Sequence, residues 1–209
     1  MRILLVIAAT SALALSVNVS SASAKDSYVS VTGGVTGESH YDINFADVNG
    51  RVNNESGGTF AAAWGKTLSH NLRGELAFSA SKQDVKSATI SNSTDSATGA
   101  INGKTEAYGL EGNLYYDFPV KGKLVPYVGA GVGISDLKLT LEGEDSSTSV
   151  LHLQAIAGVN YAMNPKFNLF AEVRAQRLGS FKFKIDDQNS TKDTSISNVG
   201  LLVGVRAPF

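Results

Sequence analysis

Apolar and polar residues alternate with a period of two along most of the chain from Ser27 to Phe209. Alternation of this kind is typical of β-strands that have one apolar and one polar face. The last segment shows it clearly, because one face carries Val199, Leu201, Val203, Val205, Ala207 and Phe209. The pattern predicts eight strands, at about 27–38, 58–68, 71–84, 105–118, 124–138, 149–163, 167–183 and 195–209.

The connections between these strands alternate strictly between short and long. Three short ones lie at 69–71, 119–123 and 164–166 and contain the Asn, Pro and Gly residues that favour turns. Four long polar ones lie near 39–57, 85–104, 139–148 and 184–194. An up-and-down barrel places every long loop at one end and every tight turn at the other. We therefore expect an all-β fold, an eight-stranded antiparallel up-and-down transmembrane β-barrel with four long surface loops.

The polar faces of the strands indicate which side is the interior. They carry glycines, amides and a recurring set of charges, namely Arg73, Glu75, Glu111, Glu172, Arg174 and Arg206. Lysine is scarce there, although a soluble barrel with its polar face in water would carry many lysines. Buried charges must be paired, so we predict a charge network in the lumen. A selectivity ring in a channel is the alternative, but eight strands enclose little more than side chains.

Aromatic residues on the apolar faces gather toward the two ends of the strands. Tyr116, Phe118, Tyr161 and Phe167 lie near the tight turns, whereas Phe60, Phe78 and Tyr108 lie nearer the long loops. Two aromatic girdles are what the two interfaces of a bilayer favour.

The first 24 residues form a separate segment. Arg2 supplies a positive start, the stretch 3–15 is apolar, and Ala22-Ser23-Ala24 forms a small-residue cleavage pattern. We interpret residues 1–24 as a cleaved secretory signal peptide and 25–209 as the barrel. After residue 24 no apolar run approaches the ~20 residues of a membrane helix.

Composition excludes several functions. The 18 Lys and Arg residues nearly balance 19 Asp and Glu residues, so no basic face predicts nucleic-acid binding. The chain has no cysteine, and its three histidines lack metal-ligand spacing, so we expect no metal and no cofactor. Gly129, Gly131 and Gly133 lie within one continuous strand, which favours inward glycines over a phosphate-binding loop.

Two segments carry a resemblance to a known family. Residues 107–118 (AYGLEGNLYYDF) and 126–133 (PYVGAGVG) resemble small outer-membrane barrels of the opacity-protein and OmpA transmembrane-domain type. The resemblance implies a monomer in the bacterial outer membrane, surrounded by its lipids, whose loops serve as adhesins or surface antigens that bind a host or surface ligand. It also implies that Phe209 is part of a signal read by the barrel-assembly machinery; Pro208 departs from that pattern.

We expect a structural, surface-exposed barrel that is not an enzyme. One alternative is a narrow pore for ions or small solutes. A second is a lipid-modifying hydrolase that uses His152 together with Ser147, Ser149 and Glu144. A third is a soluble barrel that carries an apolar ligand.

Overall fold

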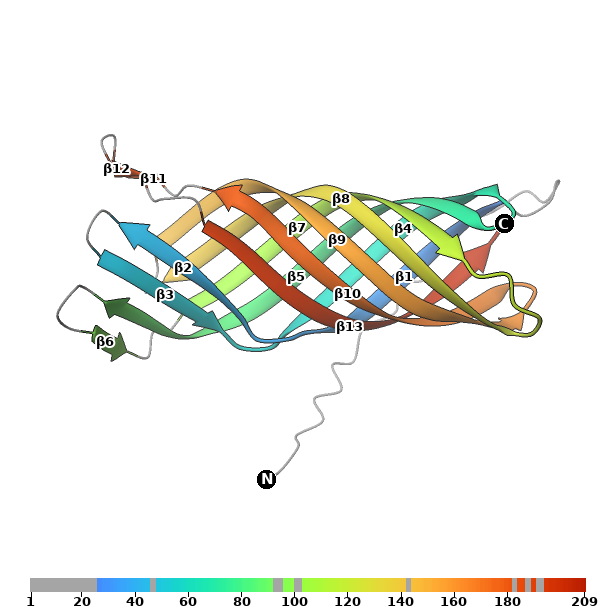
Figure 1. Ribbon diagram of the computed structural model, residues 1–209, viewed down its shortest axis with the longest axis horizontal. Coiled ribbons are helices and arrows are strands. Elements are labelled where there is room, and N and C mark those ends of the chain that lie inside the picture. The colour runs from blue at the N-terminus through green and yellow to red at the C-terminus, as the bar shows by residue number, and fades with distance from the viewer. Residues whose placement is uncertain are drawn as a thin grey trace, which may run out of the picture.

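The computed structural model describes residues 26–45, 48–91, 96–99, 103–141, 144–181, 184–186, 189–190 and 194–209. The predicted signal peptide, 1–24, lies outside them. Eight long strands form the wall of the molecule, and Figure 1 shows how they are arranged. They are β1 (Ser27–Thr36), β4 (Gly57–Ser69), β5 (Leu72–Ser91), β7 (Gly103–Asp117), β8 (Leu124–Leu141), β9 (Glu144–Asn164), β10 (Phe167–Phe181) and β13 (Thr194–Pro208). Among the described residues, no helix has the length and apolar character of a membrane span.

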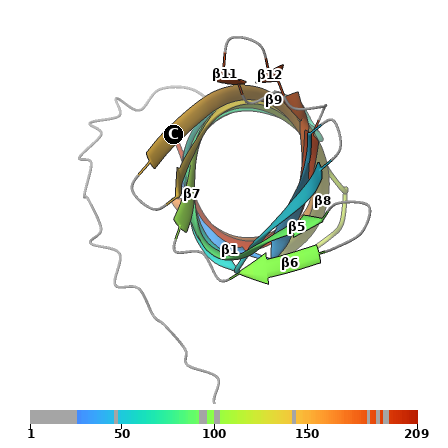
Figure 2. The ribbon, with the colours of Figure 1, turned by 90° about the vertical axis from the view of Figure 1, so that its left-hand side faces the viewer.

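The eight strands close into a barrel. Each pairs antiparallel with its neighbours in chain order, and β1 pairs with β13 to complete the ring. Val31 lies opposite Val205 in this last pair, and the Phe209 N–H donates a 2.8 Å hydrogen bond to the Ser27 carbonyl. Seen from one end, the strands surround a central axis (Figure 2). The predicted fold is confirmed, and the strand bounds agree with the sequence pattern to within a few residues at most ends.

The barrel wall turns one face outward and the other inward. In β13, Leu201 and Val203 are 57% and 62% exposed, whereas Leu202 between them is 3% exposed and faces the interior. The outward face carries an apolar belt, which ends toward the long connections where exposed Lys82 and Lys138 appear. A tilted strand crosses the apolar layer of an outer membrane, about 25 Å, in ~9–11 residues. The exposure of Leu201 and Val203 shows that the apolar face is the outer face of the wall.

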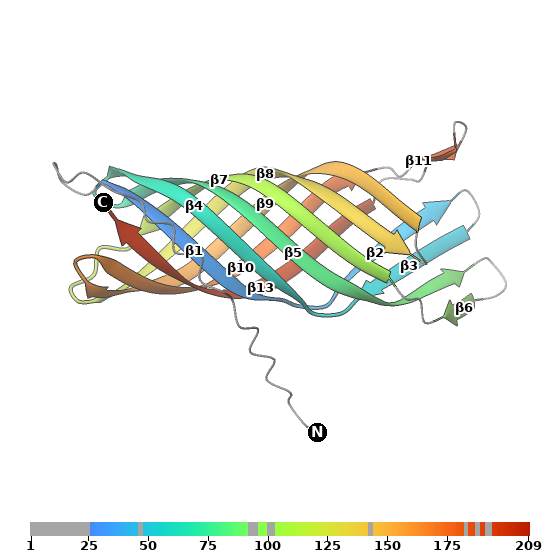
Figure 3. The same ribbon diagram turned by 180° about the vertical axis from the view of Figure 1, so that it is seen from behind.

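The connections expected to be long loops contain additional strands, which corrects the sequence interpretation. The range 39–57 forms a hairpin of β2 (Ser39–Phe45) and β3 (Val48–Asn54), and β3 pairs with β5. β6 (Ser96–Gly99) also pairs with β5, and β8 and β9 continue until Leu141 and Glu144 face each other. A short pair, β11 (Lys184–Asp186) and β12 (Asn189–Ser190), lies in the last connection. All gather at one end of the barrel (Figures 1 and 3).

Large aromatic side chains inside the barrel lie opposite glycines on the next strand. The four pairs are Tyr28 with Gly65, Tyr115 with Gly129, Tyr127 with Gly158, and Phe170 with Gly204. A Cβ atom at any of these glycines would come within 2.1–2.6 Å of the aromatic ring. The glycines therefore provide the space in which the rings lie, and the inward interpretation of Gly129 is confirmed.

Candidate functional site in the barrel lumen

All six charged residues expected in the lumen point into it, and none is more than 9% exposed. Arg73 and Glu75 come from β5, Glu111 from β7, Glu172 and Arg174 from β10, and Arg206 from β13. The alternation of the strands places them there, because each has the opposite parity to the apolar residues beside it. They divide into two groups along the barrel axis.

The first group, here called the turn-side cluster, lies near the tight turns and consists of Tyr28, Arg73, Glu75, Tyr115, Tyr127, Phe170, Glu172 and Arg206. Arg73 donates two hydrogen bonds to Asp117, at 2.6 and 2.9 Å, and a third to the Tyr28 hydroxyl at 2.9 Å. Its guanidinium carbon lies 4.6 Å from the ring centre of Tyr115 and 5.3 Å from that of Tyr127. Arg73 therefore combines a bidentate ion pair with cation–π contacts.

The tyrosines of this cluster bond carboxylates of an adjacent or next-nearest strand. The Tyr115 hydroxyl donates to Glu75 at 3.0 Å, and the Tyr127 hydroxyl donates to Glu172 at 2.8 Å. The two rings meet edge to face with their centres 5.8 Å apart. On the far side, Arg206 lies over the rings of Tyr28 and Phe170, at 4.7 and 4.9 Å. Arg206 also donates a 3.1 Å hydrogen bond to the Asn160 side-chain oxygen. The ion pair of Arg73 with Asp117, hydrogen bonds and ring contacts thus hold these side chains together.

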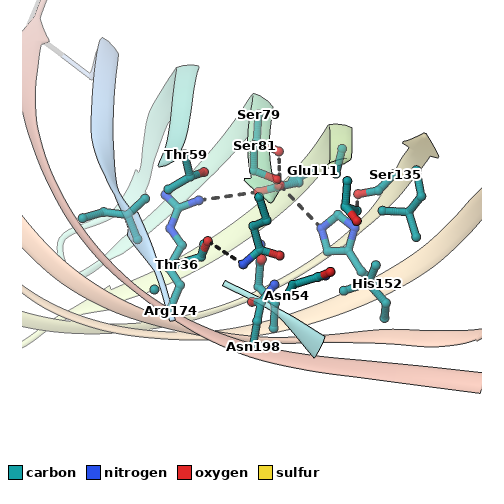
Figure 4. Close-up of a pocket in the computed structure, with 18 residues that line it drawn as sticks. Thr36, Asn54, Thr59, Ser79, Ser81, Glu111, Ser135, His152, Arg174 and Asn198 are labelled. Carbon is teal, nitrogen blue, oxygen red and sulfur yellow. Dashed lines mark hydrogen bonds and ion pairs between the residues drawn. The ribbon is translucent and has the colours of Figure 1, made fainter. Parts of the chain in front are cut away.

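The second group, here called the mid-lumen cluster, surrounds Glu111, and Figure 4 draws all of its members except Gln154. It consists of Ser79, Glu111, Ser135, His152, Gln154 and Arg174. One carboxylate oxygen of Glu111 accepts a 2.6 Å hydrogen bond from Ser79, and the other accepts a 2.8 Å bond from Gln154. Arg174 lies 3.6 Å from Glu111 and donates a 2.5 Å bond to Glu172. Arg174 therefore connects the two clusters.

His152 completes the mid-lumen cluster. Its Nδ1 atom is hydrogen-bonded to the Ser135 hydroxyl at 2.9 Å, and its Nε2 atom lies 3.6 Å from Glu111 Oε1. The His152 side chain is 2% exposed. Beside it lies a cavity of about 70 Å³, which the cluster shares with hydroxyl groups and with three leucines, Leu137, Leu178 and Leu202.

The sequence indicated the charges but missed the neutral partners. Tyr115 shares the parity of Glu111 and Asp117, so the alternation already placed it inside. Only the register revealed that Ser135 would meet His152, since the two residues lie diagonally on β8 and β9. The hydrolase considered from the sequence is not assembled as expected. Ser149 is exposed and bonds Asp136 at 2.5 Å, and the Glu144 side chain lies outside those described.

The aromatic residues predicted to form a girdle all point outward. Tyr116, Phe118, Tyr161 and Phe167 are between 39% and 44% exposed. The rings of Tyr116 and Phe118 meet edge to face at 5.4 Å. Their place at a membrane interface and the role of Phe209 in assembly stay predictions. Among the side chains described, none gathers with two others into a His, Cys, Asp or Glu group that could hold a metal ion.

The chain forms a closed barrel of eight strands with an apolar outer face and a charged lumen. Its match to a known family agrees with this structure. The chain matches the family described as outer membrane protein beta-barrel domain over residues 5–207. It belongs to that family. A relative from Haemophilus influenzae, Protein opa, is 33% identical over 115 residues, which cover 53% of this chain and 86% of the relative. The family and this relative show that the chain is a protein of the bacterial outer membrane.

Solved structures show the same fold. The chain is similar to Neisserial surface protein A, with 19% identity, a TM-score of 0.53, and coverage of 88% of this chain and 97% of that one. It is also similar to OprG from Pseudomonas aeruginosa, with 12% identity, a TM-score of 0.56 and coverage of 88% and 96%. The chain is similar as well to the outer membrane protease OmpT from Escherichia coli, with 11% identity and a TM-score of 0.53. This match covers 92% of this chain and 99% of that one. At these identities the likeness concerns the fold alone.

Proposed function

We propose that this outer-membrane barrel is a closed anchor that displays binding hairpins at the cell surface, as an adhesin or surface antigen. The observation that carries the proposal is the lumen, in which hydrogen bonds and ion pairs join buried side chains of non-adjacent strands. Tyr127 of β8 bonds Glu172 of β10, and Gln154 of β9 bonds Glu111 of β7. Side chains bonded to one another across the interior favour binding at the strand ends over transport through the barrel.

The lengths of the strands support the display of hairpins. A membrane strand needs ~9–11 residues, but β5 has 20 residues and β9 has 21. The surplus lies at the end where β2, β3 and β6 pair with each other or with β5 (Figure 3). The strand ends would therefore stand beyond the membrane as paired ribbons, which position a binding surface more firmly than single loops. The resemblance to opacity proteins agrees with such a role.

The test is to replace residues 40–53 by a two-residue Asn-Gly turn and to measure attachment of bacteria that produce the protein to host cells. We expect attachment to fall to the level of cells without the protein, because the β2–β3 hairpin is lost while the barrel register is kept. The control exchanges the tight turn at 164–166, at the opposite end, for another turn of equal length. Equal attachment of the wild type and of cells that lack the whole protein would contradict the proposal.

A further inference from the structure

Three side chains of the mid-lumen cluster form a line across neighbouring strands. Ser135 lies on β8, His152 on β9 and Glu111 on β7. The Ser135 hydroxyl is 2.9 Å from one nitrogen of His152, and the other nitrogen is 3.6 Å from the Glu111 carboxylate (Figure 4). All three side chains are at most 8% exposed, and all three line the 70 Å³ cavity. A hydroxyl, a base within hydrogen-bond reach and a third group that orients the base are the arrangement that activates a serine.

Two glycines make this convergence possible. Gly133 lies directly between Glu111 and His152 in the strand register. A Cβ atom there would lie 2.7 Å from the His152 ring and 2.9 Å from the Glu111 side chain. A Cβ atom at Gly109 would lie 2.6 Å from the Ser79 hydroxyl and 3.1 Å from that of Ser135. Because Gly109 and Gly133 have no side chain, Ser135, His152 and Glu111 can approach one another.

The surroundings hold Glu111 in place for this role. Ser79 and Gln154 each donate a hydrogen bond to its carboxylate, and Arg174 provides a positive charge at 3.6 Å. These contacts stabilise the ionised carboxylate and leave it facing His152 Nε2. Glu111 would act through His152 and is a positioning residue.

The cavity indicates the size and polarity of what could react. Its volume of about 70 Å³ holds a few water molecules or one short acyl group. Leu137, Leu178 and Leu202 line it beside the polar groups, and their apolar surface suits a methyl or ethyl group. Arg174, which pairs with Glu111 and Glu172, adds a positive charge to the polar side of the same cavity.

We propose that Ser135 is an activated nucleophile that takes a short acyl group from small carboxylic esters that enter the lumen. Ser135 Oγ attacks the ester carbonyl while His152 Nδ1 accepts its proton, and Glu111 stabilises the imidazolium that forms. The ester C–O bond breaks, the proton passes from His152 to the departing alkoxide, and an acyl-serine remains. Water then attacks this intermediate with His152 again as base, which releases the carboxylic acid and restores the Ser135 hydroxyl. This activity is separate from any binding by the hairpins.

The experiment treats the refolded full-length barrel in detergent with methanesulfonyl fluoride, a probe small enough for the cavity. An activated serine displaces fluoride, so that an O–S bond forms, the S–F bond breaks and the serine proton leaves with the fluoride. Intact-mass measurement and peptide mapping locate the label. We expect a single label on Ser135, accompanied by hydrolysis of 4-nitrophenyl acetate. An unlabelled wild-type barrel, or a label spread over other serines, overturns the proposal.

Variants then separate catalysis from structure. Ser135→Ala should remove the label, and His152→Gln should slow labelling by about 10²-fold, the usual contribution of a general base. Glu111→Gln should lower the labelling rate at saturating probe without changing the half-saturating concentration, and Glu111→Asp should restore part of the rate. Ser149→Ala, an exposed serine on β9, is the matched control and should react as the wild type does. The migration shift on boiling in detergent shows that each variant is folded; undiminished labelling of folded His152→Gln contradicts the mechanism.

Discussion

At the scale of single residues, the energetic value of a side chain depends on which side of the wall it occupies. Leu201, Leu202 and Val203 are consecutive and similar in chemistry, yet the first and third are more than half exposed while the second is buried in the lumen. A charge on the outer side must enter hydrocarbon without a partner. A charge on the inner side can be paired, as Arg174 is by Glu172 at 2.5 Å.

Val203→Arg places a charge in the middle of the outer apolar belt. We expect it to lower the free energy of unfolding by about 2–4 kcal/mol in a phosphatidylcholine bilayer, the usual cost of arginine at mid-depth. A urea titration of the barrel in vesicles measures this value. Ser197→Arg lies on the same strand face nearer the hairpin end and should cost no more than about 1 kcal/mol. If the two substitutions cost the same, the placement of the belt is wrong.

Arg73→Ala removes the centre of the turn-side cluster. It leaves Asp117 without its bidentate partner and takes away the cation that lies between the tyrosine rings. Loss of one member of a buried ion pair costs about 3–5 kcal/mol, and we expect the lower end because the Asp117 side chain stays 25% exposed. The same titration measures it. Lys66→Ala, an exposed lysine on β4, is the control and should change stability by less than about 0.5 kcal/mol.

At the scale of strand pairs, aromatic rings and glycines hold the register. Each of the four inward aromatic–glycine pairs crosses between neighbouring strands, so a slip of one residue would drive a ring into a side chain and turn the apolar face inward. Glycine in a strand ordinarily weakens it. Here the cost is offset, because the rings of Tyr28 and Tyr115 cover the glycine backbone.

Gly65→Ala tests this arrangement at one pair. The new Cβ atom would meet the Tyr28 ring at 2.1 Å, so the ring must move away from Arg73. We expect a loss of about 1–3 kcal/mol, as for other overpacked sites, with slower refolding in vesicles. Gly33→Ala is the matched control, because a Cβ atom there meets nothing within 4 Å, and it should leave stability unchanged or slightly increased. A harmless Gly65→Ala would show that the ring does not occupy this space.

At the scale of the whole molecule, the barrel is a closed wall around a filled interior. Closure leaves no unpaired edge among the eight wall strands, which is the condition for a sheet inside hydrocarbon. The turn-side and mid-lumen clusters lie one above the other, connected through Arg174. The hairpins extend the wall at one end only (Figure 1).

The filled lumen predicts electrical behaviour. In planar lipid bilayers we expect no steady conductance from the wild-type barrel. A triple substitution of Tyr115, Tyr127 and Gln154 by Ala removes bridging side chains from both clusters and should produce discrete channel openings. Substitution of the outward Tyr108, Tyr116 and Tyr161 by Ala is the control and should leave the bilayer silent. Steady wild-type currents would favour the narrow pore instead.

The sequence by itself determined the number of wall strands, their order and their facing. These follow from the alternation of apolar and polar residues, because consecutive residues such as Leu201 and Leu202 point to opposite sides of any strand. It also placed Glu111 and Arg174 inside. The extra strands at 39–57 were not predicted, although Tyr41, Ile43 and Phe45 alternate with polar residues in β2. Pairing of β2 with β3, and of β3 with β5, depends on the register of strands distant in the chain.

Only the tertiary structure decided which inward residues meet. The alternation along each strand places Ser135 and His152 on the lumen side. Contact between them depends on the register of β8 against β9 and on the absence of a side chain at Gly133. The bond between Tyr127 and Glu172 likewise crosses from β8 to β10. Such contacts depend on closure, strand tilt and curvature, which are properties of the whole ring that no short stretch of sequence contains.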